Sequence, residues 1–238
     1  MTFSERIDII YHRARQNRWL WFFSIFCRFV LALGFIPSGL TKIMGERFAS
    51  GLSVNHPMGR YLEALHHTGF YYTFIGIAQL TAAILLLIPR TVILGAMLYL
   101  PIITNICVLS FAVRFDGSHV TAPLMIMANI YILFWNYDRI KYLLPLRKGS
   151  SELLVEPMKG SNNKFPLLFF TGVIATFSIS ILYFIYGHEI MPRNSLNECE
   201  KQFKGTANEK AGLNFCKCIH TQGHDLDECL GKYESEKE

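Results

Sequence analysis

Apolar segments of about twenty residues alternate with polar stretches of varied length along the chain. Since a helix needs about 20 apolar residues to cross the hydrocarbon core of a bilayer, each segment is long enough to span a membrane. We therefore expect an all-α membrane protein with five spans. They are expected at about Trp19–Leu40, Phe70–Ile88, Thr91–Val113, His119–Tyr137 and Phe165–Gly187.

The polar stretches divide the chain around these spans. The expected parts are a basic N-terminus (1–18), a four-span unit (19–145), a linker (146–164), the fifth span (165–187) and a cysteine-containing tail (188–238). The first span is longer than the apolar region of a signal peptide and lacks an A-x-A cleavage site, so we expect it to be retained as an anchor.

Lys and Arg residues gather on two of the polar stretches. Four arginines precede the first span, and six basic residues lie in 138–164. Because cytoplasmic segments next to spans are enriched in Lys and Arg, this distribution predicts a cytoplasmic N-terminus and an outer tail. The formal charge of +5 is spread between spans rather than gathered into one patch, so we expect no nucleic-acid partner.

Composition supports a membrane protein and narrows the function. The chain is 51% hydrophobic and 17% charged, which is too apolar for an average soluble domain. It has no Walker, Rossmann or nucleophile-elbow motif, so nucleotide-binding and hydrolase chemistry has no sequence support. Five spans without a repeat or a pair of broken helices argue against a transporter.

The first span contains the most unusual charge, Arg28, with Lys42 near its outer end. A helix places these two cations roughly 21 Å apart and on nearly one face. Gly34 and Ser38 form a small-xxx-small pair that permits close helix contact. Pro37 removes a backbone hydrogen bond, which predicts a kink.

Amide side chains in other spans are candidate partners for these cations, and no span contains a carboxylate. We expect Arg28 to meet amides inside the bundle, because polar residues within a membrane usually face its interior. One interpretation is a ligand site for a quinone carbonyl or a small anion; the other is that amides and carbonyls freed by Pro37 or Pro101 satisfy Arg28 structurally. The candidate ligand-binding residues are Arg28, Lys42, Gln79, Asn105 and Asn129.

Four of the six cysteines lie in the polar tail: Cys199, Cys216, Cys218 and Cys229. A tail this small in an oxidising compartment predicts two disulfides. Pairing Cys216 with Cys218 is sterically poor, which leaves 199–216 with 218–229, or 199–218 with 216–229. Zinc binding by Cys216, Cys218, His220 and His224 is the alternative, although the spacing is not that of a standard finger, and thiol exchange is a third.

The remaining cysteines and histidines give weaker signals. Cys27 and Cys107 lie in spans without a C-x-x-C motif, so we interpret them as apolar filling rather than as redox groups. Four histidines fall on the outer side: His56, His66, His67 and His119. Adjacent His66 and His67 point to different faces of a helix, so we expect no metal site.

Span 1 and the segment after it resemble the DoxX family of small membrane proteins. The matching residues are Arg28 before an apolar run, GFIPSGLTK ending at Lys42, and NHPMGRYLEALHHTGFYYTFIGIAQLTAAILLLI into span 2. The resemblance covers roughly 20–145 and implies a four-helix bundle. Gln79 stands where relatives often have an acidic residue, and the fifth span and the tail are additions to the family's unit.

This resemblance implies several functions. Relatives include a subunit of a thiosulfate:quinone oxidoreductase, components of oxidative-stress complexes and membrane chaperones. It therefore implies a redox-linked subunit or accessory factor associated with a quinone or small anion, in a bacterial inner membrane. The alternative is a non-enzymatic chaperone or assembly factor whose outer tail binds an envelope protein. The sequence does not decide whether the protein is an enzyme.

Overall fold

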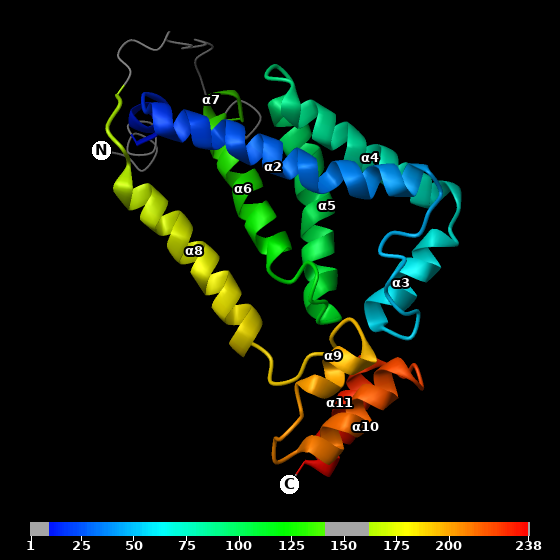
Figure 1. Ribbon diagram of the computed structural model, residues 1–238. Helices are drawn as coiled ribbons and strands as arrows, with labels where there is room; N and C mark the ends of the chain where they lie inside the picture. Colours follow the sequence, from blue (N-terminus) through cyan, green and yellow to red (C-terminus); the bar gives the residue numbers. More distant parts are fainter. Residues whose placement is uncertain (1–9, 141–161, 238) are drawn as a thin grey trace, which may run out of the picture.

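The computed structural model describes residues 10–140 and 162–237, in which the regular structure is helical apart from one isolated bridge between Asn17 and Asn162 (Figure 1). Residues 1–9, 141–161 and 238 lie outside the described part, and so does most of the linker expected at 146–164. The labelled helices are α2 (Arg18–Ile43), α3 (Pro57–His66), α4 (Phe70–Leu87), α5 (Val92–Ala112), α6 (Thr121–Trp135), α7 (Tyr137–Ile140), α8 (Leu167–Tyr186), α9 (Leu196–Lys201), α10 (Glu209–His220) and α11 (Leu226–Glu236).

Within the described ranges, four helices are long and apolar enough to cross a membrane, namely α2, α4, α5 and α8. They mark the chain as an integral membrane protein, and they lie where the first, second, third and fifth spans were expected. The fourth expected span is shorter, because α6 is apolar but has only 15 residues. It ends at Trp135, and the backbone N–H of Asn136 caps it before the short α7 begins.

The first four apolar helices pack as two antiparallel pairs. Helices α2 and α4 run side by side, and together they cross the α5–α6 pair (Figure 1). Glycines allow the close approach of α2 to α4, since a Cβ on Gly39 would lie 2.9 Å from the carbonyl oxygen of Gly76. In the expected small pair, Gly34 faces the side chain of Met125 on α6, whereas Ser38 lies beside Gln79 on α4, so the pair serves two different contacts.

The core of the bundle is formed by side chains of α2, α4, α5 and α6. The ring of Phe35 stacks on Tyr99 with 3.7 Å between centroids, and both side chains are fully buried. The Tyr99 hydroxyl donates a hydrogen bond to the Leu31 carbonyl across the same contact. Aromatic stacking with a satisfied hydroxyl is a stabilising way to bury tyrosine, and it fixes α5 against α2.

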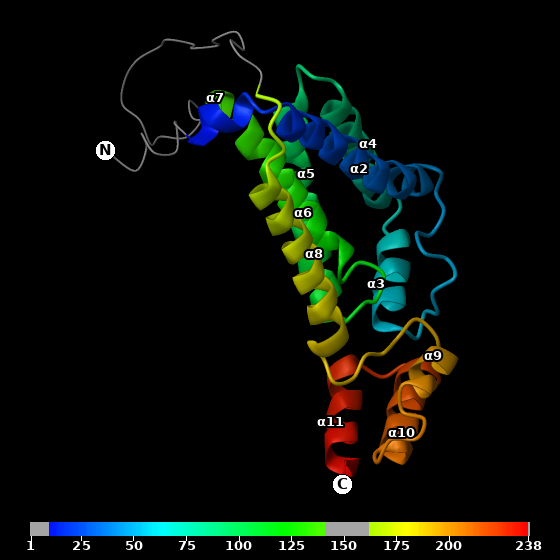
Figure 2. The same ribbon diagram turned by 60° about the vertical axis from the view of Figure 1, so that its left-hand side comes forward.

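Helix α8 stands apart from this core. It runs beside α6 (Figure 2), but no residue of α8 is buried. Near its start, Asn17 pairs with Asn162 and donates to the Lys164 carbonyl. Beyond its end the chain enters α9–α11, which pack around two disulfides below the bundle. The fifth apolar helix is therefore tied to the rest mainly at its two ends.

Candidate functional site

Arg28 is held by the end of α4. Its Nε donates to the Leu86 carbonyl at 2.7 Å, and its terminal nitrogen donates to the Leu87 carbonyl at 2.6 Å. The last carbonyls of a helix lack partners within the helix and carry partial negative charge, so they suit a guanidinium. Arg28 therefore caps α4. Its acceptors differ from the amides and the proline-freed carbonyls that the sequence suggested.

Lys42 lies in a separate polar cluster near the C-terminal end of α2. Its Nζ donates to the Ser38 hydroxyl at 2.6 Å, and that hydroxyl lies 3.2 Å from the Gln79 Oε1 atom. Lys42 is only 5% exposed and lies 4.5 Å from the centroid of the Phe48 ring. It is buried rather than snorkelling, and no ion pair joins it to a carboxylate in the part of the chain that the structure describes.

The two asparagines lie in different places again. Asn129 is fully buried and donates to the Ala96 carbonyl at 2.9 Å, while its Oδ1 has no partner among the described residues. Asn105 lies on the exposed face of α5. Among the five candidate residues the structure brings together only Lys42 and Gln79. Gln79 cannot reach Arg28, because it lies seven residues, or roughly 10 Å, along α4 from Leu86.

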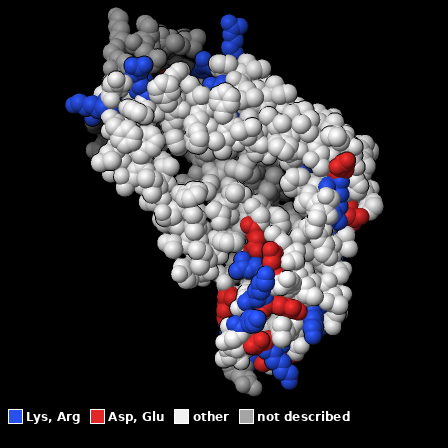
Figure 3. All heavy atoms as spheres, in the orientation of Figure 1, with Lys and Arg blue, Asp and Glu red and all other residues white. Residues whose placement is uncertain are grey.

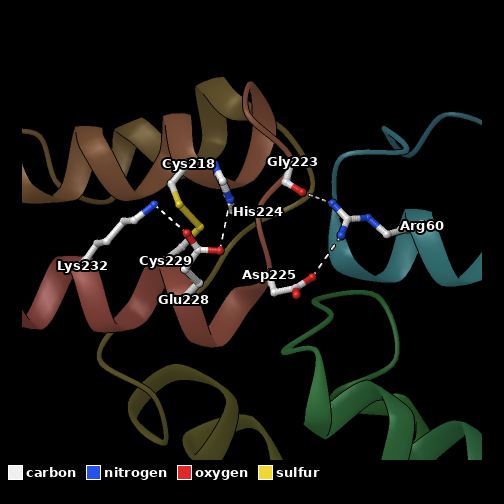
Figure 4. The surroundings of a disulfide bond; sticks show 8 residues. All are labelled: Arg60, Cys218, Gly223, His224, Asp225, Glu228, Cys229 and Lys232. Carbon is white, nitrogen blue, oxygen red and sulfur yellow. Dashed lines mark hydrogen bonds and ion pairs between the residues drawn. A yellow bond between two sulfur atoms is a disulfide. The ribbon is translucent and has the colours of Figure 1, made fainter.

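The tail cysteines form two disulfides, Cys199–Cys216 and Cys218–Cys229. The first of the two connectivities left open by the sequence is the one formed. Because these sulfurs are bonded to one another, they are not available as the zinc ligands of the alternative interpretation. Near the second disulfide, Glu228 lies 3.1 Å from the His224 ring nitrogen and 2.8 Å from the Lys232 amine (Figure 4).

The tail is docked on the polar loops of the bundle. Arg60 of α3 reaches across to the Gly223 carbonyl and to Asp225, which is 3.0 Å away (Figure 4). Asn55 donates to the His220 carbonyl at 2.8 Å. On the other side, Arg114 donates to the Ile190 carbonyl at 2.9 Å. These pairs are 76 or more residues apart in sequence, so no local pattern could have predicted them.

His56 lies at the centre of this docking interface and is fully buried. Its Nδ1 accepts from the backbone N–H of Met58 at 3.1 Å and so caps α3. The ring centroid lies 5.9 Å from that of His220. Burial, reinforced by His220, lowers the pKa of His56 to about 4, which keeps the imidazole neutral at ordinary pH. The position of His56 directly before Pro57 indicates the start of a helix in the sequence, but nothing in the sequence indicates that the side chain is buried.

An apolar cleft opens between α2, α6 and α8, with a volume of about 630 Å³. Its walls include Cys27 and Leu31 from α2, Met125 and Tyr131 from α6, and Gly172 and Phe177 from α8. The Tyr131 hydroxyl is already used, since it donates to the Leu20 carbonyl at 2.9 Å. The cleft exists because α8 stands apart from the bundle, so sequence patterns could not predict it.

Comparisons with known proteins place the chain without assigning a function. No family model and no solved structure matches it. It is similar to the uncharacterized protein YwoB of Bacillus subtilis, with 33% identity over 128 residues, which cover 49% of this chain and 77% of that relative. Because this similarity extends over more than two thirds of the relative, the chain belongs to the same protein family as YwoB.

Proposed function

We propose that the protein is a redox-linked accessory protein of the membrane, and that the cleft between α2, α6 and α8 binds the isoprenoid chain of a quinone. The observation that carries this proposal is the size and character of the cleft. Its volume of about 630 Å³ lies within the range of about 300–1,000 Å³ that is usual for small-molecule sites. The DoxX-like pattern of span 1 supports the same ligand class.

The lining favours an apolar chain over a polar substrate. Two hydroxyl groups in the lining already donate hydrogen bonds to backbone carbonyls and are not available to a ligand. Tyr131 donates to Leu20, and Thr176 donates to Gly172 at 2.9 Å. The thiol of Cys27 is a weak donor that behaves as a small apolar group. A ligand in this cleft gains mainly from the burial of apolar surface.

This proposal moves the ligand away from Arg28. Two of the five guanidinium N–H donors are engaged by the carbonyls of α4, whereas Cys27 and Leu31 face the cleft from another side of α2. Arg28 then serves to fix α4 against α2. In this proposal the tail lies outside the cytoplasmic membrane of a bacterium, where disulfides persist, and the N-terminus lies inside.

The test is mass spectrometry of quinones extracted from the purified protein. Gly172 faces open space, with nothing within 4 Å of an added Cβ, so Gly172→Phe fills the cleft without a clash at its own backbone. We expect wild type and Arg28→Ala to retain quinone, and Gly172→Phe to lose most of it. Ile77→Phe, on the exposed surface of α4, is the matched control that retains it. Wild type without quinone, or equal quinone in Gly172→Phe, would contradict the proposal.

One observation favours a non-enzymatic assembly factor as the second candidate. Many of the charged side chains visible in Figure 3 lie over the tail; others lie at the opposite end of the molecule and on its right-hand side, and the surface between them is largely uncharged. A charged, disulfide-linked surface suits another envelope protein. This candidate predicts a quinone-free protein that co-purifies with a partner, and loss of that partner when exposed tail charges such as Lys217 are reversed.

A further inference from the structure

Helix α5 presents polar side chains on the face that it turns away from the bundle. Thr104 and Asn105 are both exposed, whereas Tyr99 and Ile103 on the opposite face are buried. Neither Thr104 nor Asn105 has a side-chain hydrogen bond within the described residues, in contrast to Asn129, which donates to Ala96. One turn earlier, Pro101 lacks the N–H that would bond the carbonyl of Met97.

Asn105 lies near the middle of α5, where a polar side chain without a hydrogen bond is energetically unfavourable in a membrane. Asn105 is the fourteenth of the 21 residues of α5, so it lies only about 4.5 Å along the axis from the centre of the helix. A side chain that short cannot reach the interfacial water from there. An amide in hydrocarbon without a hydrogen bond costs several kcal/mol, so a partner in the plane of the membrane must supply the bond.

A second copy of the chain is the partner that fits this position. Rotation about an axis along the membrane normal keeps every residue at its own depth, so Asn105 meets Asn105 of the other copy. A carboxamide carries both donors and acceptors and is therefore complementary to itself. The shallow hollow around it is lined by Leu100, Pro101, Thr104, Asn105 and Val108 and leaves room for a helix to approach.

We propose that two copies pair through this face of α5, with the Asn105 amides exchanging hydrogen bonds across the twofold axis. Asparagine and threonine side chains commonly bond across helices in membranes. The proposal is independent of the quinone cleft, which lies between α2, α6 and α8. A dimer without quinone and a quinone-binding monomer are distinguishable results.

The test is the oligomeric state of the protein in lipid vesicles over a range of protein-to-lipid ratios, measured by single-molecule photobleaching. We expect wild type to be dimeric. Asn105→Leu should raise the dissociation constant of the dimer about five- to thirtyfold, since interhelical hydrogen bonds in membranes contribute about 1–2 kcal/mol. Asn105→Gln keeps the carboxamide and should stay dimeric. Thr81→Val, on the exposed surface of α4, should have no effect.

Disulfide cross-linking between engineered cysteines tests whether the contact between the two copies lies on α5. Val108 lies on the same exposed face as Asn105, three residues further along, and Ile77 is exposed on α4. Val108→Cys should cross-link two copies under mild oxidation, and Ile77→Cys should not. Intact tail disulfides in each variant report correct folding. A wild-type monomer at every ratio, an unchanged dimer in Asn105→Leu, or an Asn105-dependent complex with a different protein would overturn the proposal.

Discussion

The helical bundle and the disulfide-linked tail bury polar groups in different ways. In the bundle, side chains bond to backbone carbonyls of neighbouring helices, as Arg28 does to α4 and Asn129 does to α5. In the tail, small helices are joined by covalent bonds and docked by charged and histidine side chains. In Figure 3 many charged side chains lie over the tail, whereas the surface in the middle of the molecule is largely uncharged.

This difference follows from the solvent of each region. Inside a bilayer no water competes for a carbonyl, so one buried hydrogen bond can fix two helices against each other. The long apolar segments keep the helices themselves in the hydrocarbon core. In water, three helices of at most 12 residues cannot bury enough apolar surface to be stable alone. The tail therefore depends on cross-links and on its contacts with the loops.

The largest expected effect separates the two regions. Replacing Cys218 and Cys229 by serine should destabilise the tail by about 3 kcal/mol, because the unfolded tail gains chain entropy. Hydrogen exchange should accelerate in α10 and α11 and stay slow in α2 and α4. Reductant should reproduce this pattern in wild type, since Cys27 and Cys107 are not cross-linked. Equal acceleration in α2 would show that the regions do not differ as described.

Acid should weaken the interface between the two regions. The pKa of His56 is about 4 in the folded protein, below its ordinary value of about 6.5, so the unfolded state binds a proton more readily. The neutral imidazole of His56 therefore contributes to the free energy of unfolding fully above pH 6.5. This contribution, about 3 kcal/mol at most, is lost as pH falls toward 4. Melting curves of purified protein between pH 8 and pH 4 measure this loss.

His56→Asn is the matched control for the acid effect. Asparagine also caps helices, so α3 keeps its start while the titrating group is removed. The pH dependence between 6.5 and 4 should become shallower. A residual slope is expected from His188, whose pKa is lowered by burial and by Arg114 and His119. Identical slopes in both proteins would exclude His56 as the group responsible.

Removal of the Arg28 cap should affect the bundle and spare the tail. Arg28→Leu leaves the Leu86 and Leu87 carbonyls without donors, which should cost about 2 kcal/mol. Arg28→Lys restores one donor and should recover part of the loss. The melting temperature in detergent measures both, with an expected decrease of about 4–8 °C for leucine. No decrease would mean that other groups satisfy the end of α4.

The smallest effect concerns a surface contact between the regions. The Arg60–Asp225 pair is substantially exposed, and such pairs contribute about 1 kcal/mol or less. Arg60→Ala removes this ion pair and the hydrogen bond to the Gly223 carbonyl. Because both contacts are exposed and weak, the rate of protease cleavage near residue 223 should rise only a few-fold. Because exposed charges are screened, the difference from wild type should shrink at high salt. A larger loss than that of the disulfide would reverse the ranking of the contacts.

The sequence predicted the features that depend on local composition. Apolar length located four of the five expected spans, and four cysteines in a polar tail predicted two disulfides. Their pairing could not be predicted, because it depends on helix register. Cys216 and Cys218 are two positions apart on α10 and so point to different sides, toward Cys199 and Cys229 respectively.

The candidate site was harder to predict because its partners are not marked by residue type. Arg28 bonds to backbone carbonyls, which every residue has, so nothing in the sequence distinguishes Leu86 from its neighbours. Polar residues at similar depth suggested convergence, but Asn105 is on the outer face of α5 and Gln79 is beside Ser38. The cleft depends on how far α8 stands from α6, which only the tertiary structure shows.

The most direct test of the proposed function is photo-cross-linking with an isoprenoid quinone analogue in native membranes, followed by peptide mapping. The account predicts adducts on cleft residues of α2, α6 and α8, such as Val30 and Val173, and their loss when excess unlabelled quinone competes. It also predicts their loss in Gly172→Phe. Adducts spread evenly over the lipid-facing surfaces of α4 and α5, unaffected by competitor, would contradict it.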